Sequence, residues 1–310
     1  MNNKRHVPVL LDEVLEGLNI RPGGLYVDGT FGRGGHSSAI LQRLGSNGRL
    51  LAFDRDPDAV GQQDETLRND PRFELVKAEF AEFKDYAIER QFLGKVAGLL
   101  LDLGVSSPQL DEAERGFSFQ AEGPLDMRMD PSGGVSAAEW LETVAEDDLK
   151  KVLARLGEER FAGRIARSIV AARSAKPIAT TKDLAEIVTA AVPSRGQRRH
   201  PATKTFQAIR MYVNRELEQL DRVLAATPDL LCPGGRLCVI SFHSLEDRRV
   251  KRFMRAASQV PAPYRGLPDV PAEYRPRMKI VGKAISPGEA EIAANARARS
   301  ARLRIAERLQ

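Results

Sequence analysis

The chain has 310 residues, 42% of them hydrophobic, and it contains two cysteines. This length and composition fit one large or two smaller globular domains with a buried core, and they argue against a disulfide scaffold. The chain has 47 Lys and Arg against 42 Asp and Glu, which gives a net charge of +5. So small an excess indicates nucleic-acid binding only where basic side chains cluster. We find no signal-like leader and no apolar run long enough to span a bilayer, and we expect a cytoplasmic protein without membrane contact.

Residues 25–36 predict a strand, a glycine-rich loop and the start of a helix. Apolar residues lead to Asp28, and the loop that follows contains Gly32, Gly34 and Gly35. Glycine has no Cβ and adopts positive φ readily, so such a loop lets backbone N–H groups come close to a bound ligand. A glycine-rich turn between strand and helix also occurs without any ligand, and the loop by itself does not decide between the two.

A second predicted strand, 49–53, ends in Asp54, which follows Gly34 by 20 residues. Rossmann units place an acidic residue about 20 residues after the loop, where it binds the ribose hydroxyls of a nucleotide. A dinucleotide-binding motif would have a third glycine where this chain has Ser37. Asp28 followed by Gly-x-Gly is instead similar to the first motif of S-adenosylmethionine-dependent methyltransferases, which is the better interpretation.

The pattern continues as alternating helices and strands. Helices are expected near 57–68 and 83–90, and strands near 73–77, 96–101, 236–241, 279–285 and 300–307. The run 96–101 has no polar alternation, which is typical of a central parallel strand buried on both faces. A long segment separates it from the next sheet strand, although a crossover of about a dozen residues would be sufficient. We therefore expect an insertion into the sheet.

The inserted segment has helical patterns. Ser136 and Glu139 form a capping box, and Phe161, Ile165 and Ile169 recur every four residues. Further helices are expected at 149–156, 181–192 and 203–226. We predict an α/β fold, a class I (Rossmann-like) methyltransferase sheet with an inserted helical domain. The predicted domains are 1–110 and 227–310 for the two parts of the methyltransferase core, and 111–226 for a helical substrate-recognition domain.

The C-terminal part combines a basic helix at 245–256 with a long loop at 261–276. Five prolines fall in this loop, so regular structure is not expected there. We detect no internal repeat in the chain.

Ligands of open α/β sheets bind beyond the carboxyl ends of the strands. Phe80 follows the third strand, and it either covers an adenine ring or belongs to the core. The fourth strand ends at Asp102 and leads to Ser107, Pro108 and Gln109. Methyltransferases that act on amino groups have Asp, Asn or Ser followed by Pro-Pro-aromatic here, and their oxygens accept the N–H bonds of the amine and aim its lone pair at the methyl group. The chain has the Ser and one Pro, so an ordinary turn is the alternative.

The loop lacks the aromatic ring that would stack on the target base. The candidates for this ring are Phe117, Phe119, Phe242 and His243. The two cysteines and the four scattered histidines do not have the spacing of metal ligands, so we predict no metal.

Residues 195–215 contain six Lys and Arg and no Asp or Glu. We predict that Arg195, Arg198, Arg199 and Lys204 bind RNA, with a solvated basic face as the ordinary alternative. An enzyme that methylates a base has to extrude the target nucleotide or act on a single strand.

Several long motifs occur in order along nearly the whole chain. They are HVPVLL at 6–11, DGTFGRGGH at 28–36, LDLGVSSPQLD at 101–111, RGFSF at 115–119, PLDMRMD at 124–130, HPAT at 200–203 and SFHSLEDR at 241–248. Together they resemble the RsmH (MraW) family of bacterial 16S ribosomal RNA cytosine-N4 methyltransferases. The resemblance implies transfer of a methyl group from S-adenosylmethionine to N4 of a cytosine in the decoding centre of the small ribosomal subunit.

The same resemblance implies which residues act. Cofactor contacts are implied at Gly34, Gly35, His36, Asp54, Phe80, Asp102 and Gln109, and the glycine loop adds Gly32. Asp102, Ser107 and Pro108 are the catalytic candidates. Whether Asp102 also accepts a proton stays open, and no oligomer is predicted. The alternatives are a DNA or protein amine methyltransferase on the same core, or a nucleic-acid-binding or assembly factor that has lost turnover.

Overall fold

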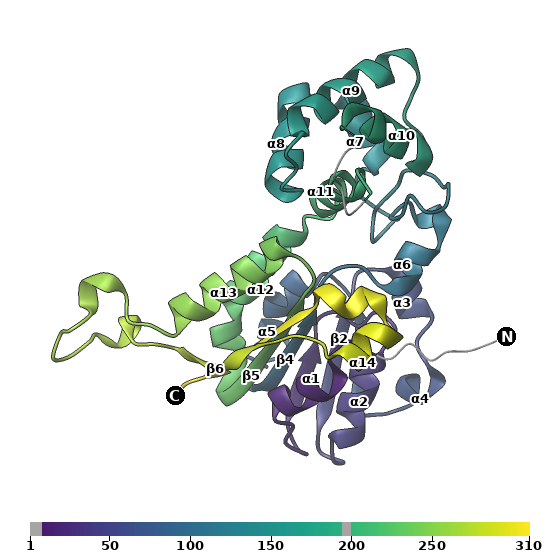
Figure 1. The fold of residues 1–310 in the computed structure, drawn as a ribbon. Helices are drawn as coiled ribbons and strands as arrows, with labels where there is room; N and C mark the ends of the chain where they lie inside the picture. The colour runs from purple at the N-terminus through teal and green to yellow at the C-terminus, as the bar shows by residue number, and fades with distance from the viewer. Residues whose placement is uncertain (1–7, 194–199) are drawn as a thin grey trace. The chain divides into compact units, whose positions relative to one another are not determined.

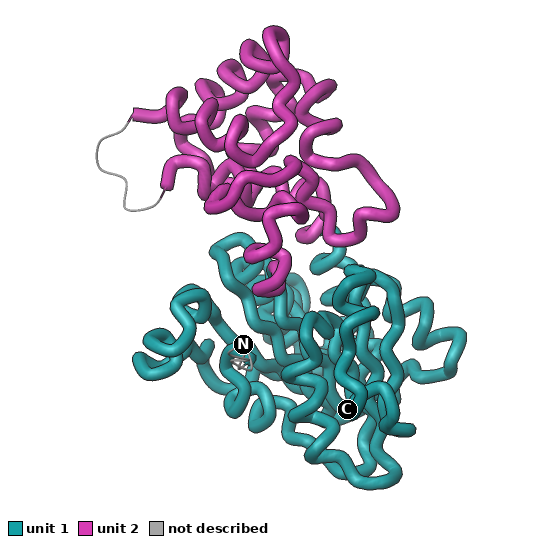
Figure 2. The backbone as a smooth tube through the Cα atoms, turned by 90° about the vertical axis from the view of Figure 1, so that its right-hand side faces the viewer, with its two compact units in different colours: residues 1–104, 218–310 teal, residues 105–217 magenta. Residues whose placement is uncertain are grey.

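The computed structural model describes residues 8–193 and 200–310, which form two compact units (Figures 1 and 2). Unit 1 comprises residues 1–104 and 218–310, and unit 2 comprises residues 105–217. Unit 2 thus begins six residues before the insertion expected at 111–226 and ends nine residues before its end.

Unit 1 contains a seven-stranded sheet in the order β3-β2-β1-β4-β5-β7-β6. The strands are β1 Leu25–Asp28, β2 Arg49–Asp54, β3 Phe73–Lys77, β4 Val96–Asp102, β5 Leu231–Ser241, β6 Met278–Ile285 and β7 Arg302–Arg308. The first five run parallel, whereas β7 is antiparallel to both of its neighbours. The predicted α/β fold is confirmed. The chain moves outward in opposite directions from β1 and β4, so ligands are expected beyond the carboxyl ends of these two strands.

Helices cover both faces of this sheet. They are α1 Leu11–Leu18, α2 Gly35–Arg43, α3 Pro57–Gly61, α4 Glu65–Arg68, α5 Phe83–Glu89, α12 Glu216–Leu230, α13 Ser244–Ala257 and α14 Glu289–Ala294. Ala97 and Leu100 of β4 face a hydrophobic cluster with α1 and α2, whereas Leu99 and Leu101 face a second cluster with α5, α12 and α13. Both faces of β4 are therefore buried, as its uninterrupted apolar run predicted.

Unit 2 is helical around its own hydrophobic cluster. Its helices are α6 Ser107–Asp111, α7 Ala137–Thr143, α8 Glu146–Leu156, α9 Ala162–Ala175, α10 Thr181–Ala191 and α11 Thr203–Val213. The predicted capping box of α7 is present: Ser136 Oγ accepts the N–H of Glu139 at 3.2 Å, and a Glu139 carboxylate oxygen accepts the N–H of Ser136 at 2.8 Å.

Two predicted helices are each divided in the structure. The segment 57–68 forms α3 and α4, which have separate aspartate caps. The predicted helix 203–226 ends at Val213, and α12 begins at Glu216. Between them Arg215 has φ of +50°, and Asn214 accepts a hydrogen bond from Met129 N at 2.8 Å. The prediction of one helix was wrong because the apolar period continues across the turn and periodicity does not reveal it.

Within 8–193 and 200–310, no helix is long and apolar enough to cross a membrane.

Candidate functional site

The loop between β1 and α2 is held at both ends by the buried carboxyl group of Asp28. Its Oδ2 accepts the hydroxyl of Ser37 at 2.7 Å, and its Oδ1 accepts the N–H of Thr30 at 3.1 Å. Burial raises the pKa of Asp28, and these hydrogen bonds oppose the rise. The group therefore ties the end of β1 to the first turn of α2.

The glycines of this loop meet two different steric demands. Gly32 and Gly34 have φ of +55° and +72°, in the left-handed region that favours glycine. At Gly35 the demand is space, because a Cβ there would lie 2.4 Å from Cγ of Pro8. Since α2 begins at Gly35, the N–H groups of its first turn, which an α-helix leaves without intrahelical acceptors, lie at this loop.

Asp54, at the end of β2, is directed at the same loop. Its Oδ2 accepts the N–H of Gly32 at 2.8 Å, and its Oδ1 accepts the N–H of Asp56 at 2.9 Å. Burial raises the pKa of Asp54 to about 6, and the charges of Asp56 and Asp28 add to the rise. Each carboxylate oxygen has a second acceptor position, so the group has capacity for two ligand hydroxyls.

Asp102 and His36 form a pair of polar side chains with unused hydrogen-bonding capacity. Asp102 ends β4, its N–H donates to Thr30 Oγ1 at 2.7 Å, and its Oδ2 lies 3.6 Å from His36 Nε2. In the described part of the chain, neither Asp102 Oδ1 nor His36 Nε2 has a hydrogen-bond partner. Buried polar atoms are nearly always satisfied in native proteins, so this pair points to a bound ligand.

Burial also sets the charge of this pair. It raises the pKa of Asp102 to about 8, helped by the negative charges of Asp28 and Glu246, and it lowers the pKa of His36 to about 4. Both side chains are therefore mainly uncharged at neutral pH in the free protein. A cation beside Asp102 would favour its ionised form and lower its pKa.

Phe80 lies beside the same edge of the sheet. It opens a short 3₁₀ turn, Phe80–Glu82, and a Cβ on Gly29 would lie 3.2 Å from the Phe80 Cβ. The half-buried ring also packs against the cluster that contains α5. Adenine contact and core packing are both compatible with this position, so the role of Phe80 stays a prediction.

The other predicted site residues belong to unit 2. Ser107 and Pro108 form the first turn of α6, and the buried Gln109 accepts the N–H of Ser106 at 2.9 Å in a capping box. Lys204 is exposed and its Nζ donates to the carbonyl of Glu158 at 2.7 Å. Arg195, Arg198 and Arg199 lie outside the described residues.

The candidate rings differ in availability. Phe117 is 5% exposed in the core of unit 2, which removes it as a ring for the target base. Phe119 stacks on His200 with ring centroids 4.5 Å apart. Phe242, in unit 1, is half-buried, and a Cβ on Gly104 would lie 3.7 Å from its ring.

Two supporting residues were missed by the sequence analysis. Thr30 connects the glycine loop to β4 through its hydroxyl. Glu246 is 2% exposed and accepts the N–H groups of Phe242 at 2.9 Å and His243 at 3.3 Å, which fixes the turn after β5. Glu246 could have been recognised from the sequence, because it lies three residues after the N-cap of α13 in a capping box. The N-cap residue is His243, however, and histidine is unusual at this position.

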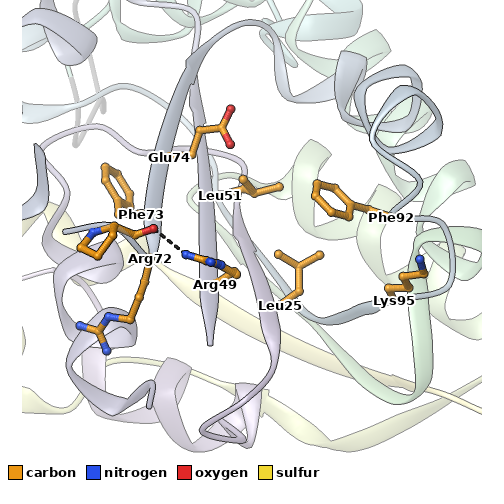
Figure 3. A pocket seen from close by; sticks show the side chains of 9 residues that line it. Leu25, Arg49, Leu51, Arg72, Phe73, Glu74, Phe92 and Lys95 are labelled. Carbon is orange, nitrogen blue, oxygen red and sulfur yellow. Dashed lines mark hydrogen bonds between the residues drawn. The ribbon is translucent and has the colours of Figure 1, made fainter. Parts of the chain in front are cut away.

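A cavity of about 570 Å³ lies at the opposite, amino ends of β1, β2 and β3 (Figure 3). It is lined by Leu25, Arg49, Leu51, Pro71, Arg72, Phe73, Glu74, Phe92 and Lys95. None of the predicted site residues lines it. The site described above is therefore separate from this cavity and lies at the carboxyl edge of the sheet.

The sequence profile of the MraW methylase family matches residues 3–309. The chain belongs to the MraW methylase family. As a member of this family, it is an S-adenosylmethionine-dependent methyltransferase.

Two solved methyltransferase structures align with this chain at low sequence identity. An rRNA methylase from Streptococcus thermophilus is 14% identical over 97% of this chain and 94% of that chain, with a TM-score of 0.38. An O-methyltransferase from Thermotoga maritima is 10% identical over 100% of this chain and 69% of that chain, with a TM-score of 0.41. Only the family match bears on the activity of this chain.

The substitution Asp102→Asn is expected to stabilise the cofactor-free MraW-family protein and to change its pH dependence. A carboxyl group whose pKa is about 8 in the folded state binds its proton more tightly there than in the unfolded chain. It therefore lowers the stability progressively as the pH rises from about 4 to about 8. Asparagine removes this effect, so the gain should be small near pH 4 and grow steadily to several kcal/mol near pH 8.

Chemical unfolding of both proteins at several pH values measures this gain. Asp85→Asn, on the exposed face of α5, is the matched control and should leave the profile unchanged. A gain from Asp102→Asn that is the same at every pH would contradict the raised pKa.

Proposed function

We propose that this MraW-family protein transfers a methyl group from S-adenosylmethionine to the exocyclic N4 amine of a cytosine in 16S ribosomal RNA. The observation that carries the proposal is the Asp102–His36 pair beside the glycine loop and Asp54, because Asp102 Oδ1 and His36 Nε2 have no hydrogen-bond partner among the described residues. The motif resemblance supports the choice of base and of the small-subunit decoding centre.

The carboxyl edge of the sheet fits the proposed cofactor in three respects. Asp54 has acceptor positions for the two ribose hydroxyls, and the first turn of α2 offers backbone N–H groups behind glycines. Asp102 and His36 have polar atoms that a ligand would satisfy. Bound S-adenosylmethionine supplies an electrophilic methyl group on a positively charged sulfur. Gly34, Gly35, Phe80 and Gln109 complete the proposed binding set, with Gly32 shaping the loop.

The proposed role of the loop after β4 is to orient the amine. The hydroxyl of Ser107 and a backbone carbonyl would accept its two N–H bonds, with Pro108 holding the turn in place. Hydrogen bonding of this kind directs the nitrogen lone pair at the methyl carbon, and reaction requires an approach of about 3 to 3.5 Å. Asp102 contributes through its charge, since its ionised form would be favoured beside a positively charged ligand.

The proposed substrate requires the base to be accessible. A cytosine within folded RNA has to be extruded or presented in a single-stranded segment before its amine reaches such a site. The basic segment 195–215, of which Lys204 is an exposed member, would bind the flanking phosphates.

The substitution Asp54→Ala is expected to weaken binding of S-adenosylmethionine about 100-fold, because two hydrogen bonds to a charged group contribute about 3 kcal/mol together. Isothermal titration calorimetry measures the affinity directly. Asp85→Ala removes an exposed carboxylate from the same unit and should bind as the unmodified protein does. Unchanged affinity in Asp54→Ala, with circular dichroism showing a folded protein, would remove Asp54 from the site.

The choice of substrate is tested by offering the protein a radiolabelled methyl donor together with ribosomal subunits, DNA or a protein extract. We expect label in the RNA of the small subunit, in a nucleoside that comigrates with N4-methylcytidine. Label in DNA or protein would favour an amine methyltransferase of a different class. Donor binding without any transferred label would favour a factor that has lost turnover.

A further inference from the structure

The loop between α13 and β6 contains a short repeat that the sequence analysis missed. Val-Pro-Ala-x-Tyr-Arg occurs at 260–265 and again at 270–275. Each copy forms a 3₁₀ turn in which the tyrosine N–H donates to the proline carbonyl at 2.9 Å. In each copy the arginine Nε also donates to the valine carbonyl, at 3.0 and 2.8 Å. The repeat escaped notice because six residues is far shorter than the periods of known repeat folds.

The two copies pack on each other through their tyrosines. The rings of Tyr264 and Tyr274 are stacked, with centroids 3.8 Å apart and an interplanar angle of 14°. Figure 1 shows the segment extending away from the sheet as a long loop between α13 and β6. We call residues 258–277 the arm. The paired turns give it a defined conformation despite its five prolines, and Arg265 and Arg275 are exposed on it.

The helix that leads into the arm has one basic face. Arg248, Lys251, Arg252 and Arg255 are exposed and follow the i, i+3, i+4, i+7 spacing of a single helix face. The opposite face is anchored, because Val250 and Met254 are buried in the cluster that also contains α12. We call these four exposed bases the basic face of α13.

Both acidic residues of α13 have partners outside this face. Glu246 is buried, and Asp247 is bound by Arg304 at 2.7 Å. Residues 244–277 hold eight Lys and Arg against four Asp and Glu, an excess of four where the whole chain has an excess of five. Residues 244–277, which comprise α13 and the arm, are therefore one of the locally basic parts of the chain.

We propose that the basic face of α13 and the arm form a second RNA-binding surface. This surface belongs to unit 1 and contacts phosphates of the ribosomal RNA. Arg248 and Arg255 are seven residues apart, or about 10 Å along the helix, so the basic face extends over two turns. Basic side chains held at fixed positions on an anchored helix suit a regularly charged polyanion. Arg265 of the arm extends the same charge, whereas Arg275 is paired with Asp269 at 2.9 Å. This inference rests on the proposed function, since it deepens the description of the RNA substrate.

The test uses the full-length triple variant Lys251→Gln, Arg252→Gln and Arg255→Gln. The control removes three exposed bases elsewhere on unit 1, with Arg43→Gln, Arg68→Gln and Lys95→Gln, so both variants have the same net charge. Three measurements are made: binding to small-subunit RNA as a function of KCl, KM and kcat for methylation of the subunit, and calorimetric affinity for S-adenosylmethionine.

In the α13 variant we expect the logarithmic salt slope of RNA binding to fall by about two to three. We also expect KM for the subunit to rise at least tenfold while the affinity for S-adenosylmethionine is unchanged. A slope and a KM equal to those of the control variant would overturn the inference. If KM rises but the salt slope for naked RNA stays the same, the face binds a ribosomal protein and the RNA assignment is wrong. Failure of the unmodified protein to methylate RNA at all would instead overturn the proposed function.

Discussion

The carboxyl group of Asp28 is the interaction on which the site depends. It accepts hydrogen bonds from Thr30 and Ser37 while buried, so it fixes the glycine loop at the point where β1 ends and α2 begins. Thr30 then carries this restraint to β4 through the N–H of Asp102. Asp54 reaches the loop from β2 through Gly32. Three adjacent strands are thus connected at one edge by a small hydrogen-bond network.

The network has an electrostatic consequence. Three carboxyl groups, Asp28, Asp54 and Asp102, lie at the ends of neighbouring strands, and burial raises the pKa of each of them. Ionised carboxylates at such a site lower the stability of the folded protein when no ligand is bound. The site therefore favours ligands that bring hydroxyl donors or positive charge. S-adenosylmethionine has a ribose diol, an ammonium group and a sulfonium, which is the combination that these groups would stabilise.

Much of the fold could be predicted from the sequence, because its signals are local. The apolar run of β4 predicts a strand buried on both faces, and the cap at Ser136 follows from spacing alone. The break between α11 and α12 could not be predicted, since it depends on Asn214 bonding to a distant segment of unit 2. The VPAxYR repeat was visible in the sequence, but its meaning depends on the tyrosine stack, which only the folded chain brings together.

The candidate site divides in the same way. Glycine positions and the spacing to Asp54 were readable because the loop is continuous in sequence, and the structure joins Asp54 to Gly32. The contact between His36 and Asp102 joins the first turn of α2 to the end of β4, so periodicity carried no information about it. The roles of Ser107, Pro108 and Gln109 stay predictions that rest on the motif.

The most direct test of the central claim is a nucleoside mass analysis of 16S RNA from a strain that lacks the gene, with and without a plasmid that encodes the protein. The account predicts that N4-methylated cytidine disappears from the deletion strain and returns with the plasmid. An unchanged nucleoside profile would contradict it and would require a different acceptor for the methyl group.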